Sequence, residues 1–119
     1  MLKDEGGARL AVNAWNWGVL HHTLELGGVL DEDTLVLVRC GGATLDAEQA
    51  SRALRYLEAV VLPKLPAGHR MLANLSVTAD PDDGTFHRDD LAKNYSLHHD
   101  VLTSVIEFLR TSRGTVSVL

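Results

Sequence analysis

Both tryptophans of this 119-residue chain lie in one five-residue segment, Asn13-Ala14-Trp15-Asn16-Trp17. Tryptophan has the largest apolar side chain, and its ring N–H needs a hydrogen-bond acceptor when it is buried. Helical residues advance by about 100° each, so residues two apart point about 200° apart. If the segment is helical, Trp15 and Trp17 cannot both face one core, and one of them lies in a groove, at a seam or on the surface. In an extended segment both would share one face.

The two tryptophans have a structural and a functional interpretation. Aromatic side chains are usually buried, so the simpler interpretation makes both Trp15 and Trp17 anchors of the core. The functional interpretation makes one of them a binding hot spot, a role in which tryptophan is enriched. We expect Asn16 to form local hydrogen bonds rather than to contact a ligand.

The composition predicts a single globular domain over residues 9–119, preceded by a flexible, glycine-rich N-terminus over residues 1–8. An apolar fraction of 45% is ordinary for a globular protein and is sufficient for a hydrophobic core. The net charge of -5 argues against nonspecific nucleic-acid binding, which depends on lysine and arginine. This charge suits a basic protein partner, although an acidic surface also serves plain solubility.

The single cysteine and the absence of long apolar runs both favour a cytoplasmic protein. Cys40 is the only cysteine, so no internal disulfide can form, which suits a reducing compartment. The N-terminal segment lacks the apolar core of a secretory signal, and no apolar run approaches the roughly 20 residues that cross a bilayer. We therefore expect a cytoplasmic protein without membrane association. We also expect Cys40 to be a small thiol buried in the core.

Capping signals predict most of the helices. Asn13 is a suitable N-cap for the first helix. Asp46 and Gln49 form an Asp variant of the capping box at the start of a second long helix, which Pro63 would end. The expected long helices span residues 14–27, 46–62 and 95–112.

The segment from 31 to 38 carries mixed signals. Its β-branched and apolar end is typical of a buried strand, whereas its acidic beginning favours the N-terminus of a helix. We favour a short helix here. Short strands over residues 9–12 and 115–119 are expected to pair with each other. These elements predict a mainly α (α+β) fold, a compact helical bundle of three or four helices with a minor sheet formed by the short terminal strands.

An acidic segment between Thr78 and Asp90 is the main candidate for partner binding. It holds five aspartates and one arginine, and its local net charge is -4 when His87 is neutral. The aspartate spacing does not fit an EF-hand loop, which also needs a bidentate glutamate at its end. Such charge clusters are usually solvated loops, but they also form docking surfaces for basic proteins. The candidate partner-binding residues are Trp15, Trp17, Asp82, Asp83, Asp89 and Asp90.

The histidines give only weak candidates for a metal site. The pairs at 21–22 and 98–99 are adjacent, so their rings would diverge by about 100° on a helix. His21 and Glu25 are better placed at i and i+4, and a zinc ion would need a further ligand such as His87. No spaced zinc signature, phosphate loop or catalytic triad is present, so we expect no cofactor and assign no catalytic residue.

Four short motifs resemble those of a group of small acidic bacterial proteins of uncharacterised function. In that group an Asn-x-Trp-Asn-Trp opening precedes a helix, a Gly-Gly junction leads into a long helix, and a Leu-Ser-Val-Thr stretch precedes the final helix. The chain departs from this pattern at Arg113, where glycine is expected. The resemblance implies no activity, so it transfers no functional residue. The matching stretches are Asn13–Trp17, Cys40-Gly41-Gly42, Leu75-Ser76-Val77-Thr78 and Leu109–Gly114.

These observations favour a small acidic cytoplasmic binding protein, such as an immunity or antitoxin-like inhibitor of a basic partner. Clustered carboxylates and the lack of a catalytic motif motivate this hypothesis. Two alternatives stay open: a metal-dependent or small-molecule enzyme that uses the histidines, and a structural homodimer formed through apolar helices. Nucleic acid and membrane are not expected partners.

Overall fold

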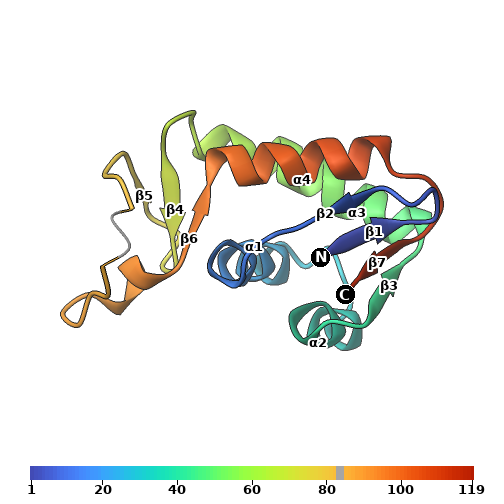
Figure 1. Cartoon of the computed structure of the whole chain (residues 1–119), viewed down its shortest axis with the longest axis horizontal. Helices are drawn as coiled ribbons and strands as arrows, with labels where there is room; N and C mark the ends of the chain where they lie inside the picture. Colours follow the sequence, from blue (N-terminus) through green and yellow to red (C-terminus); the bar gives the residue numbers. More distant parts are fainter. Residues whose placement is uncertain (83–84) are drawn as a thin grey trace.

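The computed structural model describes residues 1–82 and 85–119, and it shows a mixed α+β fold (Figure 1). The expected helical bundle with one minor sheet is wrong. The described residues form two antiparallel sheets, one at each end of the molecule, and helices α3 and α4 run between them (Figure 1). The α-helices are α1 (Ala14–Gly27), α2 (Glu32–Cys40), α3 (Ala47–Tyr56) and α4 (His99–Thr111).

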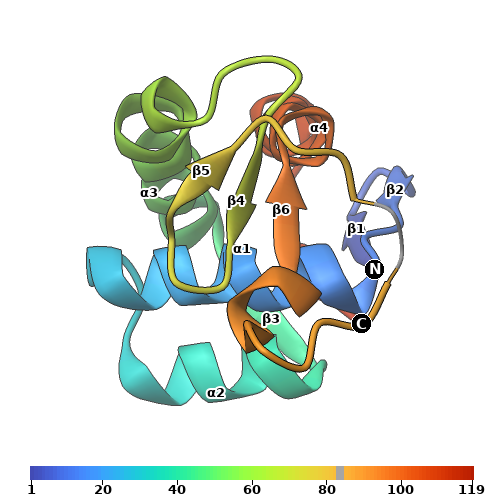
Figure 2. The same cartoon turned by 90° about the vertical axis from the view of Figure 1, so that its left-hand side faces the viewer.

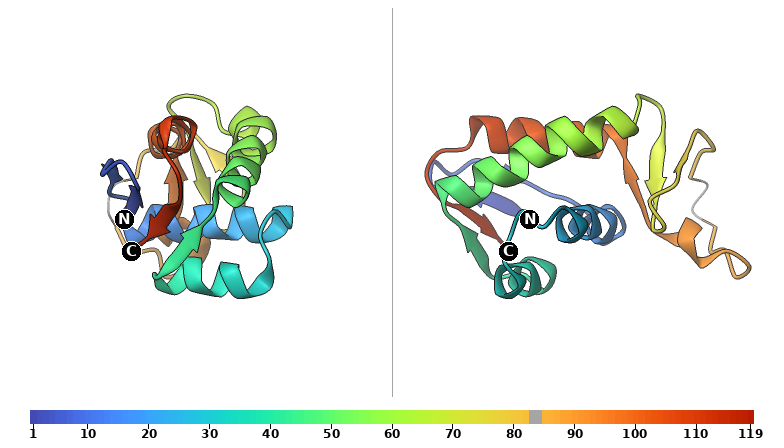
Figure 3. Two further views of the ribbon diagram at one scale, coloured as in Figure 1. Left: turned by 90° about the vertical axis from the view of Figure 1, so that its right-hand side faces the viewer. Right: turned by 180° about the vertical axis from the view of Figure 1, so that it is seen from behind.

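The first sheet has the strand order β2-β1-β7-β3, and the second has the order β5-β4-β6. In Figure 2 the second sheet lies in front of α1, which crosses behind it. Figure 3 shows the two chain ends side by side, where the Leu119 N–H donates to the Met1 carbonyl at 2.8 Å. The strands are β1 (Leu2–Asp4), β2 (Arg9–Leu10), β3 (Ala43–Leu45), β4 (Arg70–Leu72), β5 (Val77–Thr78), β6 (Ser96–His98) and β7 (Val116–Val118).

The terminal sheet differs from expectation because β1 forms where a flexible N-terminus was expected. This strand lies between β2 and β7, so the strands near residues 9 and 116 do not pair with each other. Leu2 is paired with Leu10 on one side and with Val118 on the other. Leu2 points into the core together with Val118, and this burial explains why so short a strand is stable.

Asp4 joins the N-terminal strands to the segment before β7. Its buried carboxylate accepts the backbone N–H of Ala8 at 2.9 Å and that of Arg113 at 3.0 Å. The bond from Arg113 is the main reason that the pKa of Asp4 lies below its ordinary value, and the bond from Ala8 adds to it. The charged form of Asp4 therefore stabilises this junction.

Helices α1 and α2 begin as their capping residues predict. The Asn13 side chain accepts the N–H of Asn16 at 2.9 Å, and the predicted span of α1 is confirmed. Asp31 accepts the N–H of Thr34 at 3.1 Å, so the helix that we favoured for the ambiguous segment is also confirmed. The apolar run that resembled a strand places Val36 on the outer face of α2, where it is 58% exposed.

The second long helix begins at the predicted capping box but changes type before it ends. Asp46 and Gln49 cap each other reciprocally. After Tyr56 the chain forms a π-helical turn, η1 (Leu57–Val61), followed by the 3-10 helix η2 (Leu62–Lys64). The ring of Pro63 cannot be accommodated in a regular α-helix, because it would clash with the carbonyl four residues before it. The wider turn, in which the Leu62 N–H donates to the Leu57 carbonyl, avoids this clash.

Helix α4 begins at His99 rather than near residue 95, because the preceding residues form β6. Met71 of β4 is paired with Leu97, which is fully buried. An apolar residue at this position satisfies a strand and a helix face equally well, so its periodicity did not reveal the strand. The shared core includes the fully buried Leu20, Leu57, Leu97 and Leu102.

We predict that Asp4→Asn lowers the free energy of unfolding at pH 7. An amide nitrogen in place of one carboxylate oxygen would face a backbone N–H, so one of the two bonds is lost. Because folding lowers the pKa of Asp4, its contribution is present above the ordinary value of 3.8 and disappears as the pH falls through the folded value. The difference between variant and wild type should therefore shrink in acid.

Urea unfolding of both proteins between pH 3 and pH 7 measures this effect. The exposed Asp89→Asn is the matched control and should leave the unfolding midpoint unchanged. An equal midpoint for Asp4→Asn and wild type at pH 7 would contradict the role assigned to this carboxylate.

Candidate binding site

The first turn of α1 directs the two tryptophans to different environments. Trp17 packs against the core, and its ring N–H donates to the Val38 carbonyl at 3.2 Å. Trp15 is 52% exposed. The helical geometry that separates the two rings is confirmed, and the interpretation of both tryptophans as core anchors is wrong for Trp15.

Trp15 lies against Tyr95, which the sequence did not single out. The ring centroids are 4.9 Å apart, with an angle of 48° between the planes, and Tyr95 is itself 44% exposed. A Cβ at Gly18 would lie 3.6 Å from the tyrosine ring, so Tyr95 rests on the surface of α1 where that helix has no side chain. The alternation of Tyr95, Ser96 and Leu97 is a strand signal that could have revealed this position.

A hollow of about 450 Å³ lies beside Trp15. Phe86, which is 64% exposed, forms part of its wall together with Lys93 and His98. We call Trp15, Tyr95 and Phe86 the aromatic surface. A second hollow, of about 510 Å³, adjoins Tyr95 on the α1 side. Exposed aromatic rings between two hollows are typical of a surface that contacts another molecule.

The segment that carries Phe86 is fixed by one asparagine. The His87 N–H donates to the Asn94 side-chain oxygen at 2.7 Å, and the Asn94 amide donates back to the His87 carbonyl at 3.1 Å. Within this loop the short 3-10 helix η3 (Leu91–Asn94) is capped by Asp90, whose carboxylate accepts the Ala92 N–H at 3.2 Å. These bonds hold the loop that ends beside Tyr95.

Asn16 connects the first turn of α1 to β6. Its side chain is buried, accepts the backbone N–H of His98 at 2.8 Å and donates to the Asn13 side chain at 2.9 Å. The expected local bond is present, but the bond to a residue far along the chain was not predicted. Through it, the residue next to Trp15 is tied to the strand that follows Tyr95.

The candidate aspartates have different positions. Asp82 lies in the wall of the hollow beside Trp15, with its carboxylate 3.7 Å from the His98 ring. Asp89 and Asp90 are exposed on the loop between Phe86 and η3. Figure 1 shows this loop, in orange, at the same end of the molecule as the second sheet. Asp83 lies outside the described residues. The structure thus places Asp82 and Trp15 in the wall of one hollow, and two further carboxylates on the neighbouring loop.

The candidate metal ligands are not all brought together. His21 is buried, and its ring nitrogen lies 2.9 Å from the Leu35 carbonyl. Glu25 lies in the wall of the same hollow as His21, whereas His87 belongs to the loop held by Asn94. Within residues 1–82 and 85–119, no three histidine, cysteine or acidic side chains are close enough to hold one ion.

Cys40 is exposed, which corrects the expectation of a buried thiol. It is the last residue of α2, and Gly41 follows with a φ of 83°. The chain turns at this glycine and enters β3, where Ala43 and Leu45 are buried in the core.

Comparison with known proteins gives no relative from which a role could be transferred. The chain matches no family model, no curated protein and no solved structure. None of the helices in the described part of the chain has the length and apolar character needed to cross a bilayer.

We predict that Asn16→Ala lowers the free energy of unfolding by about 1–3 kcal/mol, because it leaves the His98 N–H without its acceptor. Separation of Trp15 from Tyr95 should accompany this loss, and the fluorescence of Trp15 should change. Chemical unfolding and emission spectra measure both effects.

Asn74→Ala is the matched control, since Asn74 is exposed and, among the described residues, its side chain bonds only to nearby Ser76. Its effect on unfolding should be smaller, and it should leave the emission spectrum unchanged. A fully stable Asn16→Ala protein with wild-type emission would contradict the connecting role of Asn16.

Proposed function

We propose that this protein is a cytoplasmic binding protein whose aromatic surface docks a basic protein, as an immunity or antitoxin-like inhibitor would. The observation that carries the proposal is the exposed Trp15–Tyr95 pair, with the Asp82 carboxylate in the hollow beside Trp15. Large exposed apolar groups are costly in water and commonly mark interaction sites. Tryptophan and tyrosine are also the residues most enriched among binding hot spots.

The charges around the aromatic surface support a basic partner. Asp82 lies in the same hollow as Trp15, and Asp89 and Asp90 are exposed on the adjoining loop. An arginine or lysine of the partner can lie over an aromatic ring and pair with a carboxylate at the same time. Lys93 is the opposing charge in this hollow, and it can pair with an acidic group at the edge of such an interface.

A cytoplasmic location is part of the proposal and is supported by the single exposed cysteine, which suits a reducing compartment. Inhibition can be measured only once the partner protein has been identified. If the docked protein is an enzyme or toxin, the aromatic surface would cover its active region.

We predict that Trp15→Ala weakens binding of the partner by about 30-fold, the loss expected for a hot spot worth about 2 kcal/mol. Wild-type, Trp15→Ala and Val36→Ala proteins serve as baits in lysate of the source cells, and each retained protein is then purified for direct titration. Val36 is the matched control, since it is an exposed apolar residue on α2, away from the aromatic surface.

A basic protein that binds wild type and Val36→Ala equally, but Trp15→Ala far more weakly, supports the proposal. Retained proteins that are acidic, or that bind Trp15→Ala as well as wild type, would overturn it. Loss of binding in Val36→Ala alone would move the interface to α2.

We predict that Asp89→Asn slows association with the same partner and reduces its dependence on salt, with little change in the dissociation rate. Charges at the rim of an interface act mainly on the rate of encounter. Stopped-flow association at low and physiological ionic strength measures this effect, with Asp33→Asn on α2 as a control on another surface. An unchanged association rate at low salt would remove Asp89 from the interface.

A further inference from the structure

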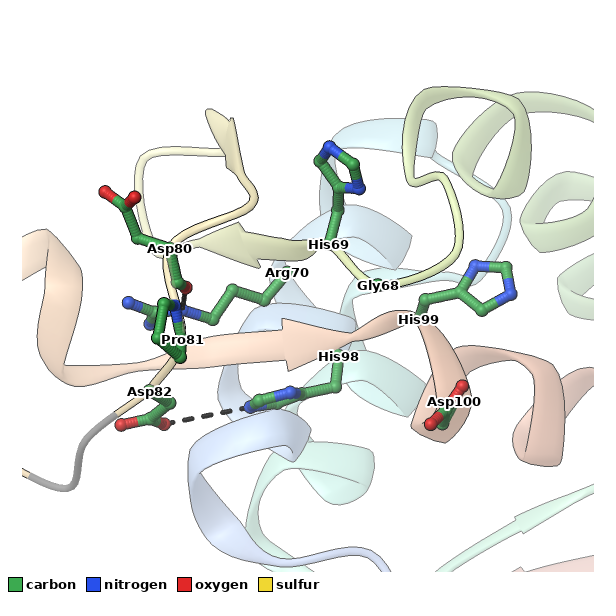
Figure 4. A pocket seen from close by; sticks show the side chains of 9 residues that line it. All are labelled: Gly68, His69, Arg70, Asp80, Pro81, Asp82, His98, His99 and Asp100. Atoms are coloured by element: carbon green, nitrogen blue, oxygen red, sulfur yellow. Dashed lines mark hydrogen bonds and ion pairs between the residues drawn. The ribbon is translucent and has the colours of Figure 1, made fainter.

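Arg70 and His21 are buried polar side chains, and each has a nitrogen without a hydrogen-bond partner among the described residues. Arg70 is 5% exposed, and its Nε donates to the Asp80 backbone carbonyl at 2.9 Å. In Figure 4 its guanidinium extends toward Asp80 and Pro81 and away from the start of α4. Its unpartnered Nη1 is fully enclosed, so this group cannot meet a ligand in the small hollow that Arg70 borders.

His21 is also largely buried, at 8% exposure, but its free nitrogen is accessible. Its Nε2 lies 2.9 Å from the Leu35 carbonyl oxygen. That oxygen can only accept, so Nε2 carries the ring proton and Nδ1 of the neutral ring keeps its lone pair. Nδ1 has no partner and is not among the enclosed unpartnered atoms in the described part of the chain. A donor from outside the protein can therefore reach Nδ1 of His21.

The space from which His21 is reached is the hollow of about 510 Å³ along α1, which we call the α1 hollow. Its wall includes Ala14, Gly18, His21 and Glu25, which follow one another at steps of three or four and so share one face of the helix. Ala73, which follows β4, lines the same hollow. The small side chains at 14, 18 and 73 leave room for a ligand over this face.

Opposite charges lie toward the two ends of the α1 hollow. The Trp17 ring donates to the Val38 carbonyl, so Arg39, the next residue of α2, lies near the turn of α1 that holds Trp17. Figure 2 shows α1 and α2 running in opposite directions. Glu25 is eight residues further along α1, about 12 Å at 1.5 Å per residue. Among the described residues neither charged side chain has an ion pair or a hydrogen bond, so both can bind a ligand.

We infer that the α1 hollow binds a short peptide of about three residues with free termini. The terminal ammonium has three N–H donors and lies between the Glu25 carboxylate and His21 Nδ1, which are neighbours one helical turn apart. The terminal carboxylate meets the Arg39 guanidinium, which matches its two oxygens in geometry. An extended residue spans at most about 3.5 Å, so the charges of one amino acid are too close together to reach both ends. This inference does not depend on the proposed protein partner.

The test is an NMR titration of the whole chain with trialanine, alanine, N-acetyl-trialanine and trialanine amide. Trialanine should bind saturably, and each blocked peptide should bind about fivefold more weakly, the loss expected for an exposed ion pair. Alanine should bind more weakly than either. Trialanine should also move the His21 Nδ1 signal, whereas N-acetyl-trialanine should not. An acetylated peptide that binds as tightly as trialanine, or an unmoved Nδ1 signal, would overturn the inference.

Variants assign each peptide end to its partner. Glu25→Gln should weaken trialanine about fivefold and leave N-acetyl-trialanine unaffected, and Arg39→Gln should do the same for trialanine and its amide. The matched controls are Glu48→Gln and Arg55→Gln, both at exposed positions on α3, and they should change neither affinity. A Glu25→Gln protein that binds trialanine as wild type does would overturn the assigned orientation and with it the site.

Trp15→Ala distinguishes this site from the proposed protein interface. Trp15 is not part of the wall of the α1 hollow, so the variant should bind trialanine as wild type does even if it loses the protein partner. A loss of trialanine binding as large as that of Glu25→Gln would place the peptide on the aromatic surface and would overturn the inference.

Discussion

The bond from the His98 N–H to the Asn16 side chain is the interaction on which the aromatic surface depends. It connects the first turn of α1, with its two tryptophans, to the strand that separates Tyr95 from α4. A buried amide satisfied on both sides fixes position more sharply than apolar packing, since hydrogen bonds have a preferred direction. The position of Tyr95 beside α1 is therefore fixed through the strand that follows it, β6.

The parts of the fold that the sequence predicted are those set by contacts within four residues. The caps at Asn13, Asp31 and Asp46 each bond to a residue three positions on, so the signal and its effect lie together. The two sheets were missed or misplaced for the opposite reason. Leu2 is a strand residue because Val118 lies beside it, and Met71 because Leu97 does. Three-residue strands show too little alternation to reveal partners so far away in the chain.

The candidate site was predictable to a similar extent. Simple helical geometry places Trp15 and Trp17 on different faces, and the exposed ring follows from it. Its contact with Tyr95 was hidden, because the tyrosine was assigned to the last helix. The burial of Arg70 has no local signal, since arginine is normally exposed and only the assembled loops around β4 cover it. Carboxylates illustrate the same limit: Asp4 is a structural hydrogen-bond acceptor, whereas Asp89 is solvent-exposed, and the sequence does not distinguish them.

The strands that border the two sheets restrict how another chain can be recognised. β2 and β5 each comprise only two residues, and β3 and β6 comprise three each. Edges this short offer too few backbone donors and acceptors for an incoming segment to extend a sheet, which also protects the molecule from edge-to-edge aggregation. Selectivity for any partner must then reside in side chains, so a handful of substitutions could redirect it without disturbing the backbone scaffold.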